Sequence, residues 1–355
     1  MTQFSRIGLD TSKAVFTLHC VDQTGHPVLR LDLRRAQLLP FFKKHASTVV
    51  AMEACGGSHH WARKLMALGH EVRLIPAQYV KPYLKRGKND RNDAEAICEA
   101  AGRPGMRPVL TKTEDQQAQA MVMKVRRTLV DQRTQLINAL RGHAAEFGLI
   151  AGKGTANVAP LLATIAAETT IPAIAREMMA LLGHQIDHLD HRIGELEARF
   201  AAMHEANAIS QLLATAPGIG PIIALTFAIE VDPAAFQSGR HLAAWLGLTP
   251  REHSTGGKQR MGGISRAGNE RLRALLVNGA MSVIHAVTTR GGKLATPWLL
   301  AMLARRPKKL VAVALANKMA RMIWAMMTRG EAWRRPLAAM AGQRPAASIR
   351  LAAQA

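Results

Sequence analysis

Residues 6–21 read RIGLDTSKAVFTLHCV, which is two β-prone runs joined by a short polar segment. A third run follows at hairpin distance, and two more are separated by helical patterns around 36–45 and 59–68. The five runs are Arg6–Asp10, Val15–Val21, Val28–Leu33, Thr48–Met52 and Glu71–Ile75. Strands in this order, with helices around the later ones, predict a mixed sheet covered by helices, which is an α/β fold.

Downstream of the predicted sheet we expect mostly helices. Residues 112–147 and 157–210 are rich in Ala, Leu, Gln, Arg and Glu and lack strand-like alternation, which predicts an antiparallel helical hairpin or coiled coil. The predicted regions are an α/β domain over 1–105, a helical coiled-coil connector for oligomerisation over 106–210, a mainly α-helical domain over 211–335, and a tail over 336–355 that is not expected to order.

The charge of the chain indicates a polyanionic partner. Lys and Arg number 47 against 25 Asp and Glu, which gives a formal net charge of +22 and a pI near 11.0. Residues 211–355 contain 20 basic and 5 acidic side chains, whereas residues 151–210 contain 4 and 7. We therefore expect the C-terminal region to bind nucleic acid, and the acidic helical stretch to be a spacer or an oligomerisation element.

No membrane-spanning segment is expected, because the longest apolar runs are interrupted by Pro217–Pro221 (PGIGP) or contain Lys318 and Arg321. The first residues, MTQFSRIGLD, lack the basic and apolar regions of a secretion signal. The cysteines, odd in number and widely spaced, are Cys20, Cys55 and Cys98. These features favour a reducing, cytoplasmic location.

Four carboxylates lie at positions from which they can share a site. Asp10 closes the first predicted strand, and Glu53 ends the fourth directly after the apolar run 49–52. Asp90 and Asp93 are three residues apart at the start of a predicted helix, so they share a face. A buried carboxylate is paired, protonated or metal-bound, so each of these side chains needs a partner.

Together these carboxylates predict a magnesium site. Carboxylate oxygens are hard ligands that suit Mg²⁺, and paired ions about 3.5–4 Å apart stabilise both the attacking and the leaving oxygen in phosphoryl transfer. The alternative is structural: Asp90 and Asp93 cap a helix, and Glu53 forms a salt bridge.

Residues 216–221, APGIGP, have apolar residues on both sides and resemble a helix-hairpin-helix turn. In such a turn the backbone N–H groups around Gly218 and Gly220 face a nucleic-acid phosphate without reading sequence. The alternative is a tight turn between two core helices.

Residues 251–260 read REHSTGGKQR and place hydroxyl groups beside glycines and close to cations. A flexible, electropositive loop of this kind is able to present a nucleophile to a phosphodiester. It is equally able to bind phosphate without a covalent role, and the residues leave both readings open. The cations and glycines expected to contact nucleic acid are Arg251, Lys258, Arg260, Arg266, Gly218 and Gly220.

These motifs resemble the DEDD-type insertion-sequence transposases of the IS110 and IS1111 group. The N-terminal motifs that carry the resemblance are GLDTSK around Asp10, MEACGGSHHWAR around Glu53, and GKNDRNDAEAI around Asp90 and Asp93. The C-terminal motifs are APGIG and AWLGLTPREHSTGGKQRMGGISRAGNERLRALL. Their order and spacing extend the resemblance over nearly the whole chain.

The resemblance implies a RuvC-like, RNase-H-like catalytic domain, a coiled-coil connector and a second domain whose serine attacks DNA. It also implies guidance by a structured non-coding bridge RNA from the flank of the element. In the family a serine directly precedes a glycine, whereas here Thr255 precedes Gly256 and Ser254 lies one place earlier. We select Ser254, because a primary hydroxyl is the less hindered nucleophile, with Thr255 as the alternative.

The sequence therefore predicts a cytoplasmic, Mg²⁺-dependent DNA transposase or recombinase. Asp10, Glu53, Asp90 and Asp93 are the expected metal ligands, and Ser254 is the expected nucleophile that forms a phosphoserine link. The expected partners are double-stranded DNA at the element ends and target, the guide RNA, and further copies of the chain in a homodimer or homotetramer. The alternatives are a RuvC-like Holliday-junction resolvase that uses the same carboxylates with water, and a non-catalytic guide-RNA-binding or DNA-binding protein.

Overall fold

The computed structural model describes residues 4–85, 87, 89–290 and 294–334. The chain divides into two compact units, with the boundary between Gln117 and Ala118. The first unit thus extends past residue 105, and the N–H of Val109 donates to the carbonyl of Leu74 at 2.7 Å. The predicted tail, 336–355, lies outside the described residues.

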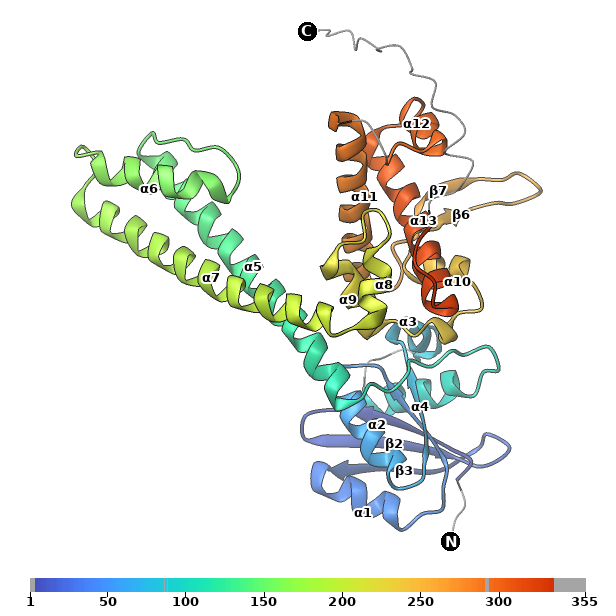
Figure 1. Ribbon diagram of the computed structural model, residues 1–355. Coiled ribbons are helices and arrows are strands. Elements are labelled where there is room, and N and C mark those ends of the chain that lie inside the picture. Colours follow the sequence, from blue (N-terminus) through green and yellow to red (C-terminus); the bar gives the residue numbers. More distant parts are fainter. Residues whose placement is uncertain (1–3, 86, 88, 291–293, 335–355) are drawn as a thin grey trace. The chain divides into compact units, whose positions relative to one another are not determined.

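A five-stranded sheet with the strand order β3-β2-β1-β4-β5 forms the centre of the first unit (Figure 1). β1 pairs antiparallel with β2 and β2 with β3, whereas β1 pairs parallel with β4 and β4 with β5. The strands are β1 Arg6–Thr11, β2 Val15–Val21, β3 Pro27–Arg34, β4 Val49–Glu53 and β5 Glu71–Ile75. The mixed α/β sheet predicted from the sequence is confirmed, with β1 as its central strand.

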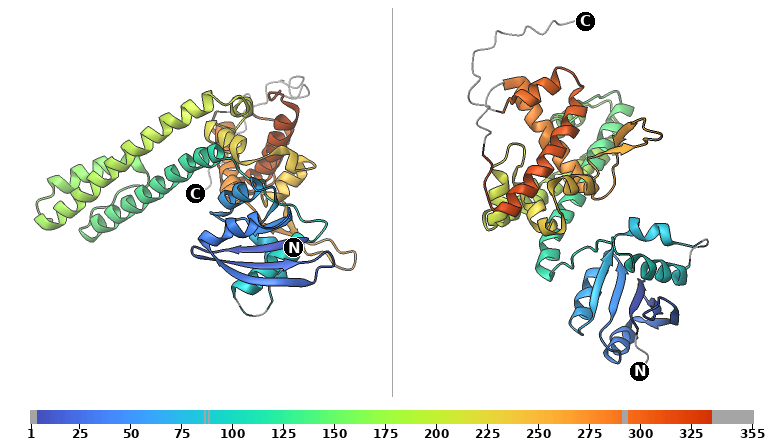
Figure 2. Two further views of the ribbon diagram at one scale, coloured as in Figure 1. Left: turned by 90° about the horizontal axis from the view of Figure 1, so that it is seen from below. Right: turned by 90° about the vertical axis from the view of Figure 1, so that its right-hand side faces the viewer.

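Helices cover both faces of this sheet (Figure 2). Side chains alternate along β1, so Ile7 and Leu9 are fully buried against α1 and α2, while Gly8 and Asp10 face α4. The helices of this unit are α1 Leu38–Lys43, α2 Ser58–Met66, α3 Ala77–Val80 and α4 Asp90–Ala101, with 3-10 helices at Arg35–Gln37 and Lys81–Tyr83. The position of Asp10 beneath α4 follows directly from this alternation.

A long helical hairpin belongs to the second unit. α5 and α7 are 33 residues each and run antiparallel, because Arg126 of α5 pairs with Glu197 of α7 while the later Arg133 pairs with the earlier Asp190 (Figure 1). An apolar cluster packs α6 against α5 and α7. The helices are α5 Glu114–Glu146, α6 Val158–Ala167 and α7 Ala173–Glu205, with a 3-10 helix at Thr155–Asn157.

The stretch 157–210, expected to be one long helical segment, is divided into several helices. Glu168 ends α6 with an extended backbone (φ −79°, ψ 98°), and Pro172 at the N-cap of α7 has no N–H with which to continue the α6 ladder. A second interruption lies at Asn207, whose side chain accepts a hydrogen bond from the N–H of Ser210 and so begins α8. These local stop and start signals override the helical composition.

The rest of the second unit is a helical bundle with a small two-stranded sheet. Leu276 and Ala280 of α11 and Ala316 and Ile323 of α13 are fully buried in its core. α11 and α13 are long and apolar enough to cross a membrane, but their buried side chains identify them as core helices, so no membrane location is indicated. The elements are α8 Ala208–Ala214, α9 Pro221–Glu230, a 3-10 helix Pro233–Ala235, α10 Gly239–Trp245, β6 Pro250–Glu252, β7 Met261–Ile264, α11 Glu270–Arg290, α12 Pro297–Leu303 and α13 Lys308–Arg329.

Candidate active site

The carboxylates of the first unit are brought together by the close packing of α4 on β1. A Cβ at Gly8 would lie 2.1 Å from the carbonyl oxygen of Ala94 and 2.6 Å from Cβ of Cys98, so only glycine permits this approach. Asp10 projects from the same face of β1 as Gly8, and Asp90 precedes Ala94 by one helical turn. The first turn of α4 therefore lies over Asp10.

Asp10, Asp90 and Asp93 form a cluster of carboxylates. One oxygen from each lies within 4.8 Å of the other two; Asp10 and Asp93 are half-buried and Asp90 is exposed. Glu53 ends β4, the parallel neighbour of β1, and its charge interacts with those of Asp10 and Asp93. The structure thus brings three of the predicted ligands close enough to bind one ion and places Glu53 beside them.

The electrostatics of the cluster favour a bound cation. Burial and the negative charges of Asp93, Asp90 and Glu53 raise the pKa of Asp10 to about 6. Burial and the charge of Asp93 also raise the pKa of Glu53. No cation among the described residues forms an ion pair with any of the four carboxylates. Uncompensated negative charge on oxygen ligands is the chemistry of a divalent-cation site.

The N-cap of α4 is Asn89. Its side chain accepts a hydrogen bond from the N–H of Asn92 at 2.8 Å. The capping role considered for Asp90 and Asp93 therefore belongs to Asn89, and the two aspartates lie in the first turn, where the helix dipole stabilises negative charge.

Ion pairs attach the start of α4 to its surroundings. Glu95 pairs with Lys85 at 2.6 Å and with Arg30 of β3 at 3.4 Å. Arg91 pairs with Asp32 of β3 at 3.6 Å. The hydrogen bond from Lys85 lowers the pKa of Glu95, so this carboxylate stays ionised at neutral pH and keeps both ion pairs. These contacts hold the helix turn that carries the two aspartates.

The predicted serine lies in the second unit, on the hairpin that β6 and β7 form. Ser254 Oγ donates a hydrogen bond to Glu252 Oε1 at 2.7 Å and accepts one from the backbone N–H of Arg260 at 3.2 Å. All three residues are exposed. The hydroxyl group is therefore oriented by two partners and remains accessible from solvent.

Two glycines close this hairpin. Gly256 (φ +54°) and Gly257 (φ +75°) both have the left-handed backbone that a type I′ turn requires. Thr255 and Lys258 pair across the turn through N–H···O=C bonds of 3.3 and 3.0 Å. The glycine-rich loop of the sequence is thus the tip of a β-hairpin, with Thr255 directly beside the turn.

The cations predicted to contact nucleic acid have different surroundings. Arg251 donates through its guanidinium to the carbonyl of Ser265 at 3.1 Å and so braces the base of the hairpin. Arg266 has a left-handed backbone (φ +56°), which is strained for a residue with a side chain. Lys258 and Arg260 are exposed near the tip. All four cations are exposed, and among them Lys258 and Arg260 lie closest to the turn.

The two glycines of the APGIGP turn also differ. A Cβ at Gly218 (φ +78°) would lie 2.7 Å from Val283 Cγ2 and 2.8 Å from the carbonyl oxygen of Gly279 on α11. Gly220 is exposed at the N-cap of α9, and an added Cβ would meet nothing within 4 Å. Gly218 therefore packs the turn onto the core, as in a tight turn between core helices, and Gly220 is the glycine accessible to a ligand.

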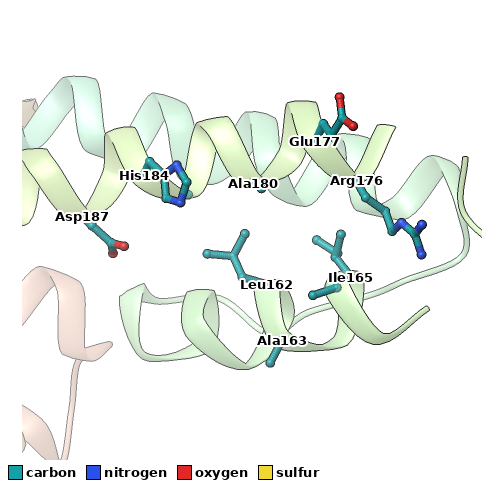
Figure 3. A pocket seen from close by; sticks show the side chains of 10 residues that line it. Leu162, Ala163, Ile165, Arg176, Glu177, Ala180, His184 and Asp187 are labelled. Carbon is teal, nitrogen blue, oxygen red and sulfur yellow. The ribbon is translucent and has the colours of Figure 1, made fainter. Parts of the chain in front are cut away.

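A groove of about 560 Å³ lies between α6 and α7 (Figure 3). Leu162 and Ile165 of α6 and His184 and Asp187 of α7 are among its lining residues. None of the residues predicted to bind metal or nucleic acid lines it, so it is separate from both candidate sites.

Two residues of these sites, Asn89 and Glu252, are not among those predicted from the sequence. Asn89 carries a local signal, because Asn directly before a helix is a common N-cap. Glu252 lies two residues before Ser254, a spacing that places both side chains on one face of a strand. The N-cap role of Asn89 is a local signal, whereas the contact between Glu252 and Ser254 can be inferred only if the loop is known to be a hairpin.

Two family models match this chain. Residues 7–147 match the DEDD transposase model of the IS110 group, described as "Transposase". Residues 210–294 match the model described as "Transposase IS116/IS110/IS902 family". The DEDD transposase domain implies a RuvC-like, RNase-H-like α/β fold, in agreement with the five-stranded mixed sheet.

Similar proteins cover nearly the whole chain. A "Putative transposase y4pF/y4sB" of Sinorhizobium fredii is 50% identical over 94% of this chain and 86% of its own length. A "Probable family 20 transposase" of Pseudomonas aeruginosa is 47% identical over 93% and 98%. The "Transposase for insertion sequence element IS1111A" of Coxiella burnetii is 39% identical over 94% and 92%. The chain therefore belongs to the IS110 family of insertion-sequence transposases, enzymes that bind, cleave and rejoin DNA.

Proposed function

We propose that the chain transposes an insertion sequence by transesterification, with Mg²⁺ held by Asp10, Glu53, Asp90 and Asp93 and with Ser254 as the nucleophile. The observation that carries the metal site is the cluster of three aspartate oxygens within 4.8 Å of one another. Oxygen ligands, an exposed side and the lack of an ion-paired cation among the described residues all suit Mg²⁺.

Within this site the metal, when bound, polarises the scissile phosphate and stabilises the leaving oxygen. The carboxylates bind a cation in their ionised form, and the pKa of Asp10 is raised to about 6 by burial and by its neighbours. Below about pH 6, a metal ion therefore has to displace a proton from Asp10. The affinity for the metal should decrease as the pH is lowered through this value.

Ser254 attacks the phosphodiester in this proposal. A bond forms between Oγ and phosphorus, the bond from phosphorus to one bridging oxygen breaks, and one DNA end stays attached to the protein as a phosphoserine. Attack of a DNA hydroxyl on that phosphoserine joins the strands and releases Ser254. Ser254 and Thr255 are both exposed, but only the Ser254 hydroxyl is oriented by two hydrogen bonds among the described residues, which favours Ser254 over Thr255.

Nucleic acid is the partner of the basic second unit. DNA binding follows from the family, and we propose that a structured guide RNA from the flank of the element binds as well, in the cytoplasm. The 20 basic residues of 211–355, against 5 acidic ones, support contacts to more than one phosphate backbone. The proposed contacts are Arg251, Lys258, Arg260, Arg266 and Gly220. Gly218, the other glycine predicted from the sequence, packs against α11 and is proposed only to shape the turn.

We further propose a homodimer or homotetramer joined through a coiled coil that includes the α5–α7 hairpin. Ile174, Met178 and Leu181 form an exposed apolar stripe on α7, with spacings of four and three residues and exposed fractions of 64%, 49% and 52%. A second copy of this hairpin is the partner that the acidic composition of the segment favours over DNA. Light scattering should report a smaller particle for Met178→Glu than for the unchanged chain.

Cleavage of a DNA duplex that carries the element end, with RNA transcribed from the flank, tests the metal site. Asp90→Ala and Glu53→Gln should lower cleavage at least about 100-fold and abolish stabilisation by Mg²⁺, because each removes a ligand or its charge. Both variants should fold and bind DNA as the unchanged chain does. Asp115→Asn, at an exposed carboxylate outside the cluster, is the matched control and should cleave normally.

Unaltered cleavage by Asp90→Ala and Glu53→Gln would exclude the carboxylate site. Binding of DNA by the unchanged chain without any Mg²⁺-dependent cleavage would favour the non-catalytic binding protein. Mg²⁺-dependent cleavage that persists in Ser254→Ala and in Thr255→Ala would instead identify water as the nucleophile, which is the resolvase alternative.

A further inference from the structure

Glu252 occupies an unusual position for an acidic residue. It is the only Asp or Glu between residues 233 and 269, and its sequence neighbours on the hairpin are the cations Arg251, Lys258 and Arg260. A carboxylate on a surface that meets phosphate backbones repels them. Its presence on this hairpin therefore needs a reason other than binding affinity.

The carboxylate is directed at one atom. Ser254 Oγ donates its proton to Glu252 Oε1 at 2.7 Å, and the N–H of Arg260 donates to the same Oγ at 3.2 Å. One lone pair of the hydroxyl is thus engaged by a backbone donor, its proton points at the carboxylate, and its second lone pair is available for a phosphorus atom. Thr255 Oγ1 has no hydrogen-bond partner among the residues that the structure describes.

We propose that Glu252 is the general base that activates Ser254. The proposal rests on the function proposed above. As the Oγ–phosphorus bond forms, the hydroxyl proton passes to Oε1 of Glu252, and the bond from phosphorus to the bridging oxygen breaks. The electron pair of that bond stays on the leaving oxygen, which takes its proton from solvent. In the rejoining step the DNA hydroxyl loses its proton to solvent, its oxygen attacks phosphorus, and Glu252 returns its proton to Oγ of Ser254.

Proton transfer to a positioned base contributes about 10²–10⁴-fold to such a step. The expected effect is therefore specific to the rate of covalent linkage. Affinity for DNA should stay the same or rise when the charge of Glu252 is removed, because repulsion of the phosphate backbone is removed with it. A residue that only shaped the hairpin would change affinity and rate together.

The test is the single-turnover rate of protein–DNA linkage, measured with the full chain, Mg²⁺, an element-end duplex and RNA from its flank. Glu252→Gln keeps an oxygen that accepts from Ser254 but is far too weak a base, and should slow linkage by about 10²–10⁴-fold. Glu270→Gln removes the next carboxylate along the chain, which is also exposed, and should leave the rate unchanged.

The pH profile gives a readout that a structural role would not change. From about pH 7.5 upward, linkage by the unchanged chain should be level, since a carboxylate that acts as the base needs no hydroxide to take up the proton. Linkage by Glu252→Gln should rise about tenfold per pH unit, because hydroxide has to replace the base. A parallel profile, displaced equally at every pH, would overturn the proposal.

A DNA duplex with sulfur in place of the bridging oxygen distinguishes two roles for Glu252, as a base toward Ser254 or as an acid toward the leaving group. Sulfur leaves without protonation, so Glu252→Gln should remain slow on this duplex if Glu252 acts on the nucleophile. Rescue of the variant by sulfur would mean that Glu252 protonates the leaving group and would overturn the assignment. Linkage at the unchanged rate in Glu252→Gln defeats this inference alone, whereas absence of any linkage in the unchanged chain defeats the proposed function as well.

Discussion

Asp10 is a single residue whose ionisation is opposed by the other carboxylates of the candidate site. Its carboxylate is half-buried, and three neighbouring carboxylates raise its free energy when all are ionised. The folded chain therefore holds a proton on Asp10 up to about pH 6, whereas the unfolded chain releases it near 3.8. The stability contributed by this protonation is complete below about pH 4 and is lost as the pH rises through about 6.

This repulsion predicts a reversal between metal-free and metal-bound protein. Without metal above about pH 7, Asp10→Asn should melt at a higher temperature than the unchanged chain, and the difference should narrow as the pH falls toward 4. With Mg²⁺ the unchanged chain should gain stability that the variant does not. Thermal melts with chelator or Mg²⁺ at several pH values measure both effects, and a lower melting temperature for the metal-free variant above pH 7 would contradict them.

Some of the site residues could be predicted from the sequence and others could not. Asp90 and Asp93 share a helical face because of their spacing alone, and the strand endings at Asp10 and Glu53 follow from local apolar runs. The contact between Glu252 and Ser254 depends on a hairpin that the loop composition did not reveal. Gly256 and Gly257 form a local type I′ turn, but the residues that flank the loop, 250–252 and 261–264, lack the apolar alternation of strands, so their composition does not predict a hairpin.

The close packing of helix α4 on strand β1 brings Asp90 and Asp93 to Asp10. Gly8 permits that approach, and the ion pairs of Glu95 and Arg91 hold the first turn of the helix. The sequence predicts Gly8 within the first strand, but it does not identify the helix that packs against it. The five strands were predictable because β-branched and apolar residues recur locally, whereas the close packing of a helix on one strand residue is a long-range property.

Gly8→Ala should push α4 away from β1, because the added Cβ would lie 2.1 Å from a backbone oxygen. We expect a loss of about 1–3 kcal/mol in the free energy of unfolding, with loss of Mg²⁺-induced stabilisation. Gly105→Ala is the matched control, since an added Cβ there meets nothing within 4 Å. Urea unfolding with and without Mg²⁺ measures both quantities, and a Gly8→Ala chain equal to the control in both would refute this account of the helix–strand contact.

The β6–β7 hairpin is the element proposed to contact phosphate through exposed cations. Replacing Lys258 and Arg260 together by Gln should weaken DNA binding and reduce the slope of log affinity against log salt by about 2, one for each lost phosphate contact. Lys153→Gln, at an exposed lysine near the tip of the helical hairpin, should leave the slope unchanged. Binding titrations at several salt concentrations decide this, and an unchanged slope in the double variant would exclude the hairpin from the interface.

For the whole molecule, the charge distribution and the order of the motifs already indicated an α/β unit followed by helices and a basic C-terminal region. The boundaries between α6, α7 and α8 do not follow from composition, which is helical throughout this stretch. They depend on two single residues, Pro172 and Asn207, which are the N-caps of α7 and α8. The proposed metal ligands and the proposed nucleophile belong to different compact units, with the α5–α7 hairpin between them in the sequence. In the proposed mechanism, both units serve one covalent reaction on DNA.

Denaturing electrophoresis of a reaction stalled after the first strand cut tests that claim most directly. The unchanged chain should yield a protein–DNA adduct in Mg²⁺, Ser254→Ala should yield none while still binding DNA and RNA, and Thr255→Ala should yield nearly as much as the unchanged chain. An adduct that survives Ser254→Ala but disappears with Thr255→Ala would contradict the choice of nucleophile. Cleavage by the unchanged chain without any adduct would contradict the covalent mechanism itself.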